Sequence, residues 1–216
     1  MFAVFGGLQQ IPQAIIDKAD ACAAKLYAVN RDYFYQRSEH SQSWMFASSG
    51  TTLNLPLGTL AVENISTAVA AVLLSGLTVT QAAISEGIQN AKLQGRFEIR
   101  QIQNKTVIFD AGHNPHGVAF LLNQLRNFLK YNKQYTEVVS VFSMLADKDV
   151  KSVTELLKDS IQMWKIAALT VPRAAPIEQL DQALQGQHVQ HFDSVKLAFK
   201  SALDETKNNQ LILVCG

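Results

Sequence analysis

The sequence predicts a layered α/β protein whose sheet is mainly parallel. Helical and strand-like apolar patterns alternate along most of the chain, which is typical of this fold class. Apolar residues make up 48% of the 216 residues, so the chain can bury a core and is not expected to be disordered. This length suits one large domain or two small ones.

Composition excludes several classes of partner. The chain has 19 basic and 18 acidic side chains, so no charge excess points to nucleic acid or to an anionic membrane. The longest apolar run, Ala68 to Leu74, is too short to cross a bilayer. The first basic residue is Lys18, whereas a secretory signal begins with basic residues. Cys22 and Cys215 lie far apart and show neither metal-site spacing nor a disulfide framework. We therefore expect a cytoplasmic protein with no metal ligands of its own.

The first part of the chain, residues 1–94, is expected to form a small mixed unit. Ala3–Phe5 predicts a strand before a Gly-Gly turn, and apolar residues at helical spacing predict a helix over Ile11–Leu26. Further short strands are predicted at Tyr27–Val29, Tyr33–Tyr35, Trp44–Ala47 and Thr51–Leu55, the last three antiparallel. Two helices follow at Asn64–Leu77 and Thr80–Leu93, and Thr80 is the expected cap of the second.

Gly95 marks a change of pattern, and we place a domain boundary between residues 94 and 95. Strands and helices then alternate to the last residue. The predicted strands are Phe97–Ile102, Thr106–Phe109, Val138–Phe142, Ile166–Thr170, a short one at Val189, and Leu211–Val214. The predicted helices begin at Pro115 and Val195 and cover Val150–Leu157 and Ile177–Leu184. Trp44 and Trp164 are expected to be packing residues.

The stretch Thr106–His116 holds the most informative local chemistry. A strand ends on Asp110, and Asn114 and Pro115 then suit the cap and the first turn of a helix. Ligands of open α/β sheets gather at the carboxyl ends of strands, where Asp110 and His113 are expected. The residues leave two interpretations open: a carboxylate and an imidazole that bind a nucleotide, or a capped turn that only starts a helix.

Several motifs, in order, resemble the C-terminal half of a folylpolyglutamate synthase, a family that is often bifunctional with dihydrofolate synthase in bacteria and is related to the Mur ligases. The matching stretches are Glu63-Asn64 before an Ala-rich helix, residues 93–98 (that family's PGRFE junction), residues 110–116 (DxAHNPH), residues 144–149 (MxxDKD) and residues 213–216 (LVCGS). The resemblance implies a Rossmann-like C-terminal Mur ligase domain, preceded by the truncated tail of an α/β ATPase domain.

The resemblance also implies roles for individual residues. Asn64 would contact the adenine side of ATP, and Arg96 would reach the β- and γ-phosphates, since a guanidinium fork suits phosphate oxygens. Asp110 would accept from the ribose hydroxyls, with His113 beside it. Without the resemblance, Asn64 is interpreted as an ordinary helix N-cap and Arg96 as a surface arginine that bridges two domains.

Two further loops carry weaker signals. Asp147-Lys148-Asp149 is either a capped, solvated turn or part of the wall of the cleft that receives glutamate, as the resemblance implies. Pro172-Arg173 resembles the family's GPR loop, but Val171 replaces the glycine. The remaining histidines, His40, His188 and His191, form no cluster in the sequence and are expected to be structural or surface residues.

An ATP-dependent amide ligase also needs parts that this sequence lacks. A P-loop requires a glycine directly before its lysine, and no lysine in this chain follows a glycine. In the family, the P-loop, the magnesium ligands and a modified lysine lie upstream of the matching half. We therefore expect residues 1–94 to be a remnant of the central ATP-binding domain. Residues 95–216 are expected to be the glutamate ligase domain without its last helix.

The resemblance implies an enzyme that adds L-glutamate to dihydropteroate and to tetrahydrofolate through an acyl phosphate, with ATP and Mg²⁺. The chain alone is expected to be inactive, because the missing N-terminal half is required, and no catalytic residue is assigned within it. Two alternatives stay open: a non-catalytic module that binds a nucleotide or a protein partner, and the C-terminal domain of another Mur-type amide ligase.

Overall fold

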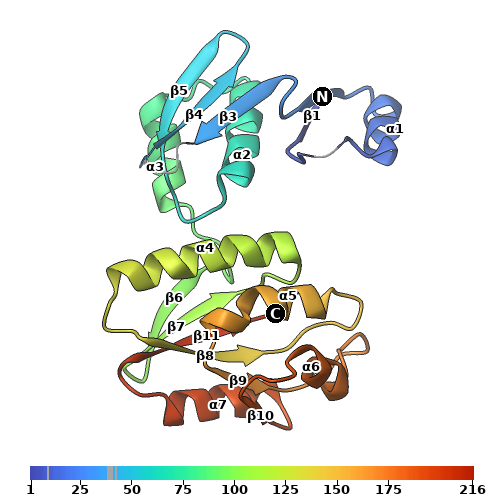
Figure 1. Cartoon of the computed structure of the whole chain (residues 1–216). Coiled ribbons are helices and arrows are strands. Elements are labelled where there is room, and N and C mark those ends of the chain that lie inside the picture. Colours follow the sequence, from blue (N-terminus) through green and yellow to red (C-terminus); the bar gives the residue numbers. More distant parts are fainter. Residues whose placement is uncertain (9, 38–40, 42) are drawn as a thin grey trace. The chain divides into compact units, whose positions relative to one another are not determined.

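The computed structural model describes residues 1–216 except residues 9, 38–40 and 42, so His40 lies outside the described residues. It divides into two compact units, Met1–Lys92 and Leu93–Gly216 (Figure 1). In the first unit, β1 (Phe2–Phe5) pairs in parallel with β2 (Lys25–Ala28), and α1 (Gln13–Ala21) connects them.

Helix α1 is shorter than the sequence predicts, and the expectation of a helix over Ile11–Leu26 is wrong at both ends. Pro12 precedes the helix with an extended ψ of 135°, so the helix begins at Gln13. At the other end Ala23 has a φ of 49°, outside the helical region. The apolar spacing continues past this point only because β2 follows directly and is itself partly buried.

The first unit also contains a three-stranded antiparallel sheet, and this confirms the predicted short strands. The strands are β3 (Tyr33–Arg37), β4 (Ser43–Ser48) and β5 (Thr51–Pro56), in the order β3-β4-β5. The Trp44 indole is buried and donates to the Pro56 carbonyl over 2.9 Å. Tyr33, Phe46 and Leu55 complete the core with apolar residues of the two following helices.

These helices are α2 (Val62–Leu74) and α3 (Gln81–Asn90). Thr80 caps α3, since its hydroxyl accepts from the Ala83 amide over 3.2 Å, as the sequence predicts. Helix α2 begins earlier than expected, after Ala61, which offers no capping side chain. Asn64 therefore lies inside the first turn, and its interpretation as an N-cap is wrong.

The second unit is a six-stranded, mainly parallel sheet with helices on both faces (Figure 1). The strand order is β10-β9-β8-β11-β7-β6, and only the β6–β7 pair is antiparallel. The strands are β6 (Glu98–Ile102), β7 (Lys105–Asp110), β8 (Glu137–Phe142), β9 (Met163–Ile166), β10 (Val189–His191) and β11 (Gln210–Cys215). The helices are α4 (Pro115–Tyr131), α5 (Val150–Leu157), the 3-10 turn η1 (Lys158–Ser160), α6 (Ile177–Ala183) and α7 (Val195–Glu205).

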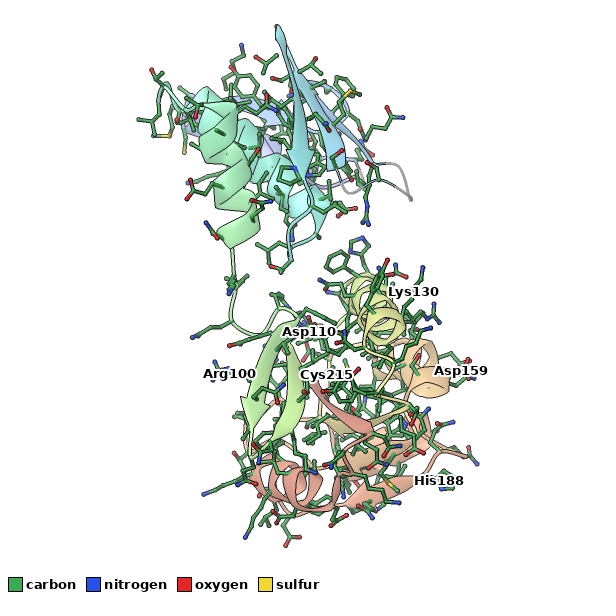
Figure 2. The ribbon with its side chains drawn as sticks, turned by 90° about the vertical axis from the view of Figure 1, so that its left-hand side faces the viewer. Arg100, Asp110, Lys130, Asp159, His188 and Cys215 are labelled. Carbon is green, nitrogen blue, oxygen red and sulfur yellow. The ribbon has the colours of Figure 1, made fainter. Side chains whose placement is uncertain are left out.

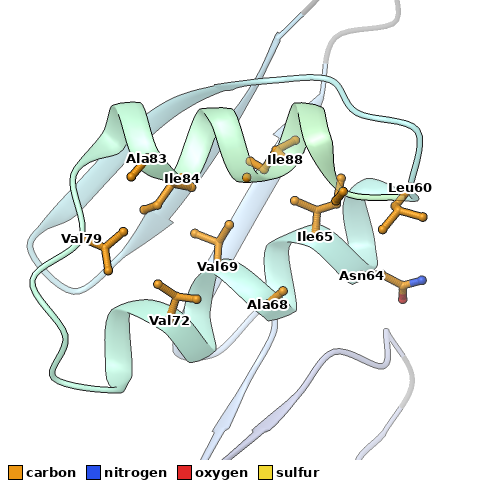
Figure 3. A pocket seen from close by; sticks show the side chains of 12 residues that line it. Leu60, Asn64, Ile65, Ala68, Val69, Val72, Val79, Ala83, Ile84 and Ile88 are labelled. Carbon is orange, nitrogen blue, oxygen red and sulfur yellow. The ribbon is translucent and has the colours of Figure 1, made fainter. Parts of the chain in front are cut away.

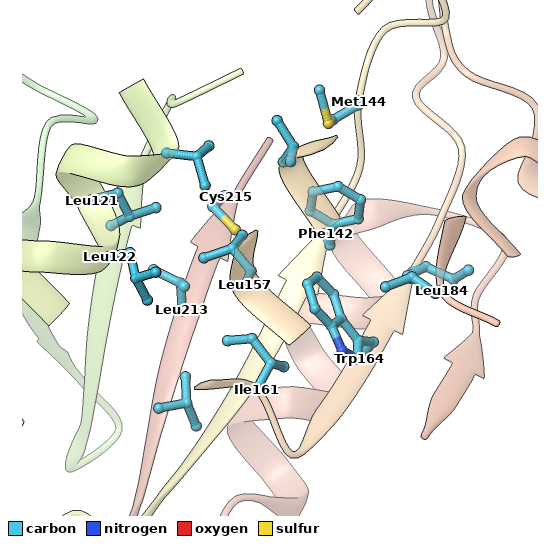
Figure 4. Close-up of a cluster of buried hydrophobic side chains, with 14 of the residues drawn as sticks. Leu121, Leu122, Phe142, Met144, Leu157, Ile161, Trp164, Leu184, Leu213 and Cys215 are labelled. Carbon is cyan, nitrogen blue, oxygen red and sulfur yellow. The ribbon is translucent and has the colours of Figure 1, made fainter. Parts of the chain in front are cut away.

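The buried strands supply side chains to both faces of this sheet. Ile108 packs on the face covered by α4, α5 and α6, while the neighbouring Val107 packs on the face covered by α7. On the first face Phe142 and Trp164 meet edge to face, with ring centroids 5.3 Å apart (Figure 4). Trp44 and Trp164 are both almost fully buried, so the prediction that they are packing residues is confirmed.

The expectation of a strand over Ile166–Thr170 is wrong, because β9 ends where that strand was to begin. Phe142 at the end of β8 pairs with Ile166, so no neighbouring residue of β8 remains to pair further along. The sequence pattern did not predict β9, because it contains Lys165 and a charged residue is unexpected in a buried strand. The Lys165 ammonium is buried but bonds to Gln190, Ser201 and Glu205. In the described part of the chain, no helix is both long and apolar enough to cross a membrane.

Candidate functional site

The carboxyl ends of β7, β8 and β11 meet at one edge of the second unit's sheet. A cavity of about 270 Å³ lies there, with Asp110, Ser143 and Cys215 in its lining, each at or just after a strand end. Val195, the first residue of α7, and Leu169 add apolar wall. Open α/β sheets bind ligands at this edge, so the fold offers a site where the sequence predicts one.

Asp110 lies at this edge of the sheet (Figure 2) and bonds to two loops. Its Oδ2 accepts from the Phe97 amide over 2.9 Å, and its Oδ1 accepts from the Gly112 amide over 2.8 Å. Burial raises the pKa of this carboxyl, while the two amides and the charge of Arg96 oppose the shift. A side chain at Gly112 would place its Cβ 2.8 Å from Oδ1, so an alanine here, as in the DxAHNPH motif, would require the Asp110 carboxylate to shift.

The loop after Asp110 leads into α4 as the sequence predicts. Asn114 is the N-cap, since its side chain accepts from the Gly117 amide over 2.8 Å, and Pro115 opens the helix. The Nδ1 atom of His113 lies 3.0 Å from the Ala111 carbonyl. Because a carbonyl only accepts, Nδ1 carries the proton in this arrangement. The Nε2 atom of a neutral His113 ring is then an acceptor.

Arg96 lies in the junction loop that enters β6. The Gly95 carbonyl accepts from the Ala111 amide over 2.7 Å, so this loop is joined to the loop after β7. Arg96 is exposed, and its charge acts on Asp110. Three of the predicted site residues, Arg96, Asp110 and His113, therefore lie on two loops that are bonded to each other.

Sequence reasoning missed Ser143 and Cys215, which also line the cavity. Ser143 is only 7% exposed, and its hydroxyl has no hydrogen-bond partner among the described residues. Cys215 lies 3.7 Å from the Ser140 hydroxyl, and burial raises the pKa of its thiol to about 12, so it is neutral. Their position in the sequence could have identified them, because both residues lie at the ends of strands that the sequence does predict.

The loop after β8 is bound to the loop after β9. Asp149 caps α5 by accepting from the Ser152 amide over 3.0 Å, which confirms the predicted capped turn. Asp147 instead accepts from Arg173, over 3.2 Å at Nε and 2.5 Å at Nη2. The pKa of Asp147 is lowered, chiefly by its hydrogen bond with Arg173. This ion pair joins residues that no local pattern connects.

The fourth predicted residue, Asn64, belongs to the first unit. It is exposed and stands at one end of a groove between α2 and α3 (Figure 3). The groove has a volume of about 300 Å³, and Asn64 is the single polar side chain in its described lining. An apolar groove with one carboxamide at its end can hold a flat ring and bond its polar edge.

The other titratable side chains show no metal centre. Among the residues that the structure describes, no group of three or more His, Cys, Asp or Glu side chains could hold an ion. His188 is exposed, and His191 pairs with Asp181 over 2.6 Å, so these two histidines are surface residues as predicted.

The sheet order, the bonded loops at its carboxyl edge and the capped start of α4 are those of an open α/β domain that binds its ligand at this edge. Residues 95–216 match the family described as "Mur ligase, glutamate ligase domain", and the chain belongs to this family. A dihydrofolate synthase/folylpolyglutamate synthase of Escherichia coli is 36% identical over 211 residues, which cover 97% of this chain and 48% of that protein.

Solved structures agree with this assignment. E. coli FolC in complex with DHPP and ADP is 36% identical, with a TM-score of 0.79, over 99% of this chain and 50% of that one. A bifunctional folylpolyglutamate synthase/dihydrofolate synthase with Mn, AMPPNP and L-glutamate bound is 30% identical, with a TM-score of 0.80, over the same shares. The chain thus spans about half the length of the relatives it matches.

Proposed function

We propose that this chain is the C-terminal half of an ATP-dependent ligase that adds L-glutamate to dihydropteroate and to tetrahydrofolate through an acyl phosphate. The observation that carries the proposal is the bonded pair of loops at the carboxyl edge of the sheet. These loops bring Arg96, Asp110 and His113 together in a domain of the glutamate ligase family. The names of the relatives give the two activities, and one related structure holds L-glutamate; the two acceptors are those that the resemblance implies.

Nucleotide contacts are proposed for residues of each unit separately. In the first unit, Asn64 contacts the adenine, and the neighbouring groove between α2 and α3 offers a surface for a flat ring. In the second unit, Asp110 accepts from the ribose, since each of its oxygens accepts one backbone amide and has a second acceptor position. Arg96 contacts the β- and γ-phosphates, and His113 borders the ribose.

Glutamate is proposed to bind beside residues 144–149, where Lys148 carries a positive charge. Mg²⁺ and the P-loop belong to the N-terminal half, whose residues are not in this sequence. Residues 1–94 are proposed to belong to the ATP-binding domain, and residues 95–216 to the glutamate ligase domain. The whole enzyme is proposed to act in the cytoplasm, and this chain alone to be inactive.

Nucleotide binding by the purified chain tests the proposal. Adding ATP should shift the NMR signals of the Arg96 and Gly112 amides, and Arg96→Ala should weaken this response about tenfold, since it removes a charge-assisted contact. Arg126→Ala is the matched control, because Arg126 is an exposed arginine on α4 of the same unit and does not line the cavity. The chain should release no ADP when glutamate and a folate are added. Absence of any ATP response would contradict the proposed nucleotide site.

A further inference from the structure

Residues 144–149, the loop after β8, are held from one side by residues 171–175, the loop after β9. The Ala146 amide donates to the Arg173 carbonyl over 2.8 Å, and the Ala175 amide donates to the Met144 carbonyl over 2.9 Å. Leu145 and Ala174 pair between them as an isolated antiparallel bridge. Backbone contacts from residues 171–175 thus fix the first residues of the loop 144–149 but not its tip at Asp147 and Lys148.

The tip is held by a side-chain pair. Arg173 donates to both carboxylate oxygens of Asp147, from Nε and from Nη2, and this two-point contact fixes orientation as well as distance. The two side chains are 63% and 48% exposed, so the pair adds little to the stability of the fold. An exposed pair with defined geometry is better suited to orient a loop than to stabilise a domain.

The same pair sets the surroundings of Lys148. The Lys148 ammonium lies 3.8 Å from Asp147, which therefore stands between two cations. Asp149 is occupied as the cap of α5 and does not join this cluster. Asp147, Lys148 and Arg173 together carry one net positive charge, and Lys151 offsets the charge of the neighbouring Asp149, so the exposed end of the loop suits a carboxylate ligand.

The replacement of the family's glycine by Val171 does not disturb this arrangement. The Ala174 amide donates to the Val171 carbonyl over 3.0 Å and closes a turn that presents Arg173. Val171 is exposed and is not among the residues with positive φ. No glycine is therefore needed for the backbone of this turn.

We propose that Arg173 is a positioning residue that acts through Asp147. The fork of Arg173 holds Asp147, Asp147 fixes the tip of residues 144–149, and Lys148 is thereby directed toward a carboxylate of the incoming amino acid. The amino acid itself rests on the proposed function, whereas the coupling of the two loops rests only on the contacts above.

The first measurement needs no ligand. Amide hydrogen exchange of the whole chain, followed by NMR, reports the opening of the two loops at Ala146 and Lys148. Arg173→Ala should speed exchange at both amides about fivefold, and Arg173→Lys should have a smaller effect because it keeps the charge but not the fork. Arg100→Ala is the matched control and should leave both amides unchanged. Unchanged exchange in Arg173→Ala would overturn the coupling.

The second measurement adds L-glutamate and follows the Lys148 amide signal. Arg173→Ala and Asp147→Asn should each weaken the response about fivefold, and the exchanged pair Asp147→Arg with Arg173→Asp should recover part of it. The response to ATP should stay the same in all variants, which a general loss of structure would not allow.

The outcomes separate the two claims. If the unaltered chain responds to glutamate and Arg173→Ala responds equally, the positioning role is wrong while the proposed function stands. If the unaltered chain shows no response to glutamate, the glutamate part of the proposed function is contradicted for this chain. The exchange measurement then still decides whether Arg173 holds the loop.

Discussion

Lys165 is the most informative position for testing how this fold tolerates charge. Its side chain is 2% exposed on β9, between β8 and β10, yet its ammonium donates to Ser201 over 2.8 Å and to Glu205 over 2.7 Å. Gln190 is a third partner. Glu205→Gln removes the negative partner and leaves a buried cation with neutral hydrogen-bond acceptors only.

The expected cost follows from the burial of the two partners. Breaking a fully buried ion pair costs about 3–5 kcal/mol. Glu205, however, is 58% exposed, so solvent already screens the pair. We therefore expect Glu205→Gln to lower the free energy of unfolding of the second unit by about 1–2 kcal/mol. Lys165→Met keeps the side-chain length and removes the charge, so the double variant should be no less stable than Lys165→Met alone.

Urea unfolding followed by tryptophan fluorescence measures these free energies. Each unit contains one tryptophan, Trp44 in the first and Trp164 in the second. Trp44→Phe therefore leaves a signal from the second unit only, and all variants are compared in that background. The matched control is Glu155→Gln, because Glu155 pairs with Lys158 on an exposed surface and should change stability little.

Two results would contradict a role for the Lys165 charge pair. If Glu205→Gln were neutral while Lys165→Met cost more than about 3 kcal/mol, the ammonium would not depend on its carboxylate partner. The contacts of the Lys165 stem would then matter more than its charge. Equal costs for Glu205→Gln and Glu155→Gln would lead to the same conclusion.

Three further predictions concern single features. The pKa of Glu205 is lowered, first by its hydrogen bond with Lys165. The contribution of Glu205 to the free energy of unfolding is therefore complete above its ordinary pKa of 4.5 and is lost as pH falls through the lower folded value. Urea unfolding from pH 7 to 3 should show this loss, and Glu205→Gln should remove this contribution. Ser143→Ala should leave the free energy of unfolding unchanged or raise it by up to about 1 kcal/mol, because it removes a buried hydroxyl without a described partner. If thermal unfolding shows a loss of more than about 1 kcal/mol, the hydroxyl is hydrogen-bonded. Gly112→Ala introduces the alanine of the DxAHNPH motif, and only the end of the Asp110 side chain has to shift, so the stability of the second unit should change by less than about 1 kcal/mol. A larger loss in thermal unfolding would show that the Asp110 carboxylate cannot move.

Local signals in the sequence predict much of this fold. Thr80 and Asn114 are caps in the structure because each presents a short side-chain acceptor before an apolar helical pattern. The strand that ends on Asp110 is predicted correctly for a similar reason, since its apolar residues stop where the polar loop begins. Such features depend on a few neighbouring residues, and those residues are visible in the sequence.

The parts that the sequence did not predict depend on distant partners. Strand β9 was missed because Lys165 interrupts its apolar run, and the residues that neutralise Lys165 come later in the chain. Asp147 and Arg173 form their pair across two loops whose proximity follows from the order of the strands. The contact of Asn64 with a nucleotide stays a prediction; the structure shows only that Asn64 lies at the end of an apolar groove between α2 and α3.

The place of β11 in the sheet has a consequence for how the chain matures during synthesis. Although β11 comes after β7 and β8 in the chain, Ile212 pairs with Val107 on one side and with Val139 on the other. Until this strand has left the ribosome, β7 and β8 lack their common neighbour, and their apolar faces stay open. The sheet of the second unit can therefore close only after β11 has been made. Chaperones that shield apolar strands should therefore act on the nascent chain mainly between the synthesis of β7 and that of β11.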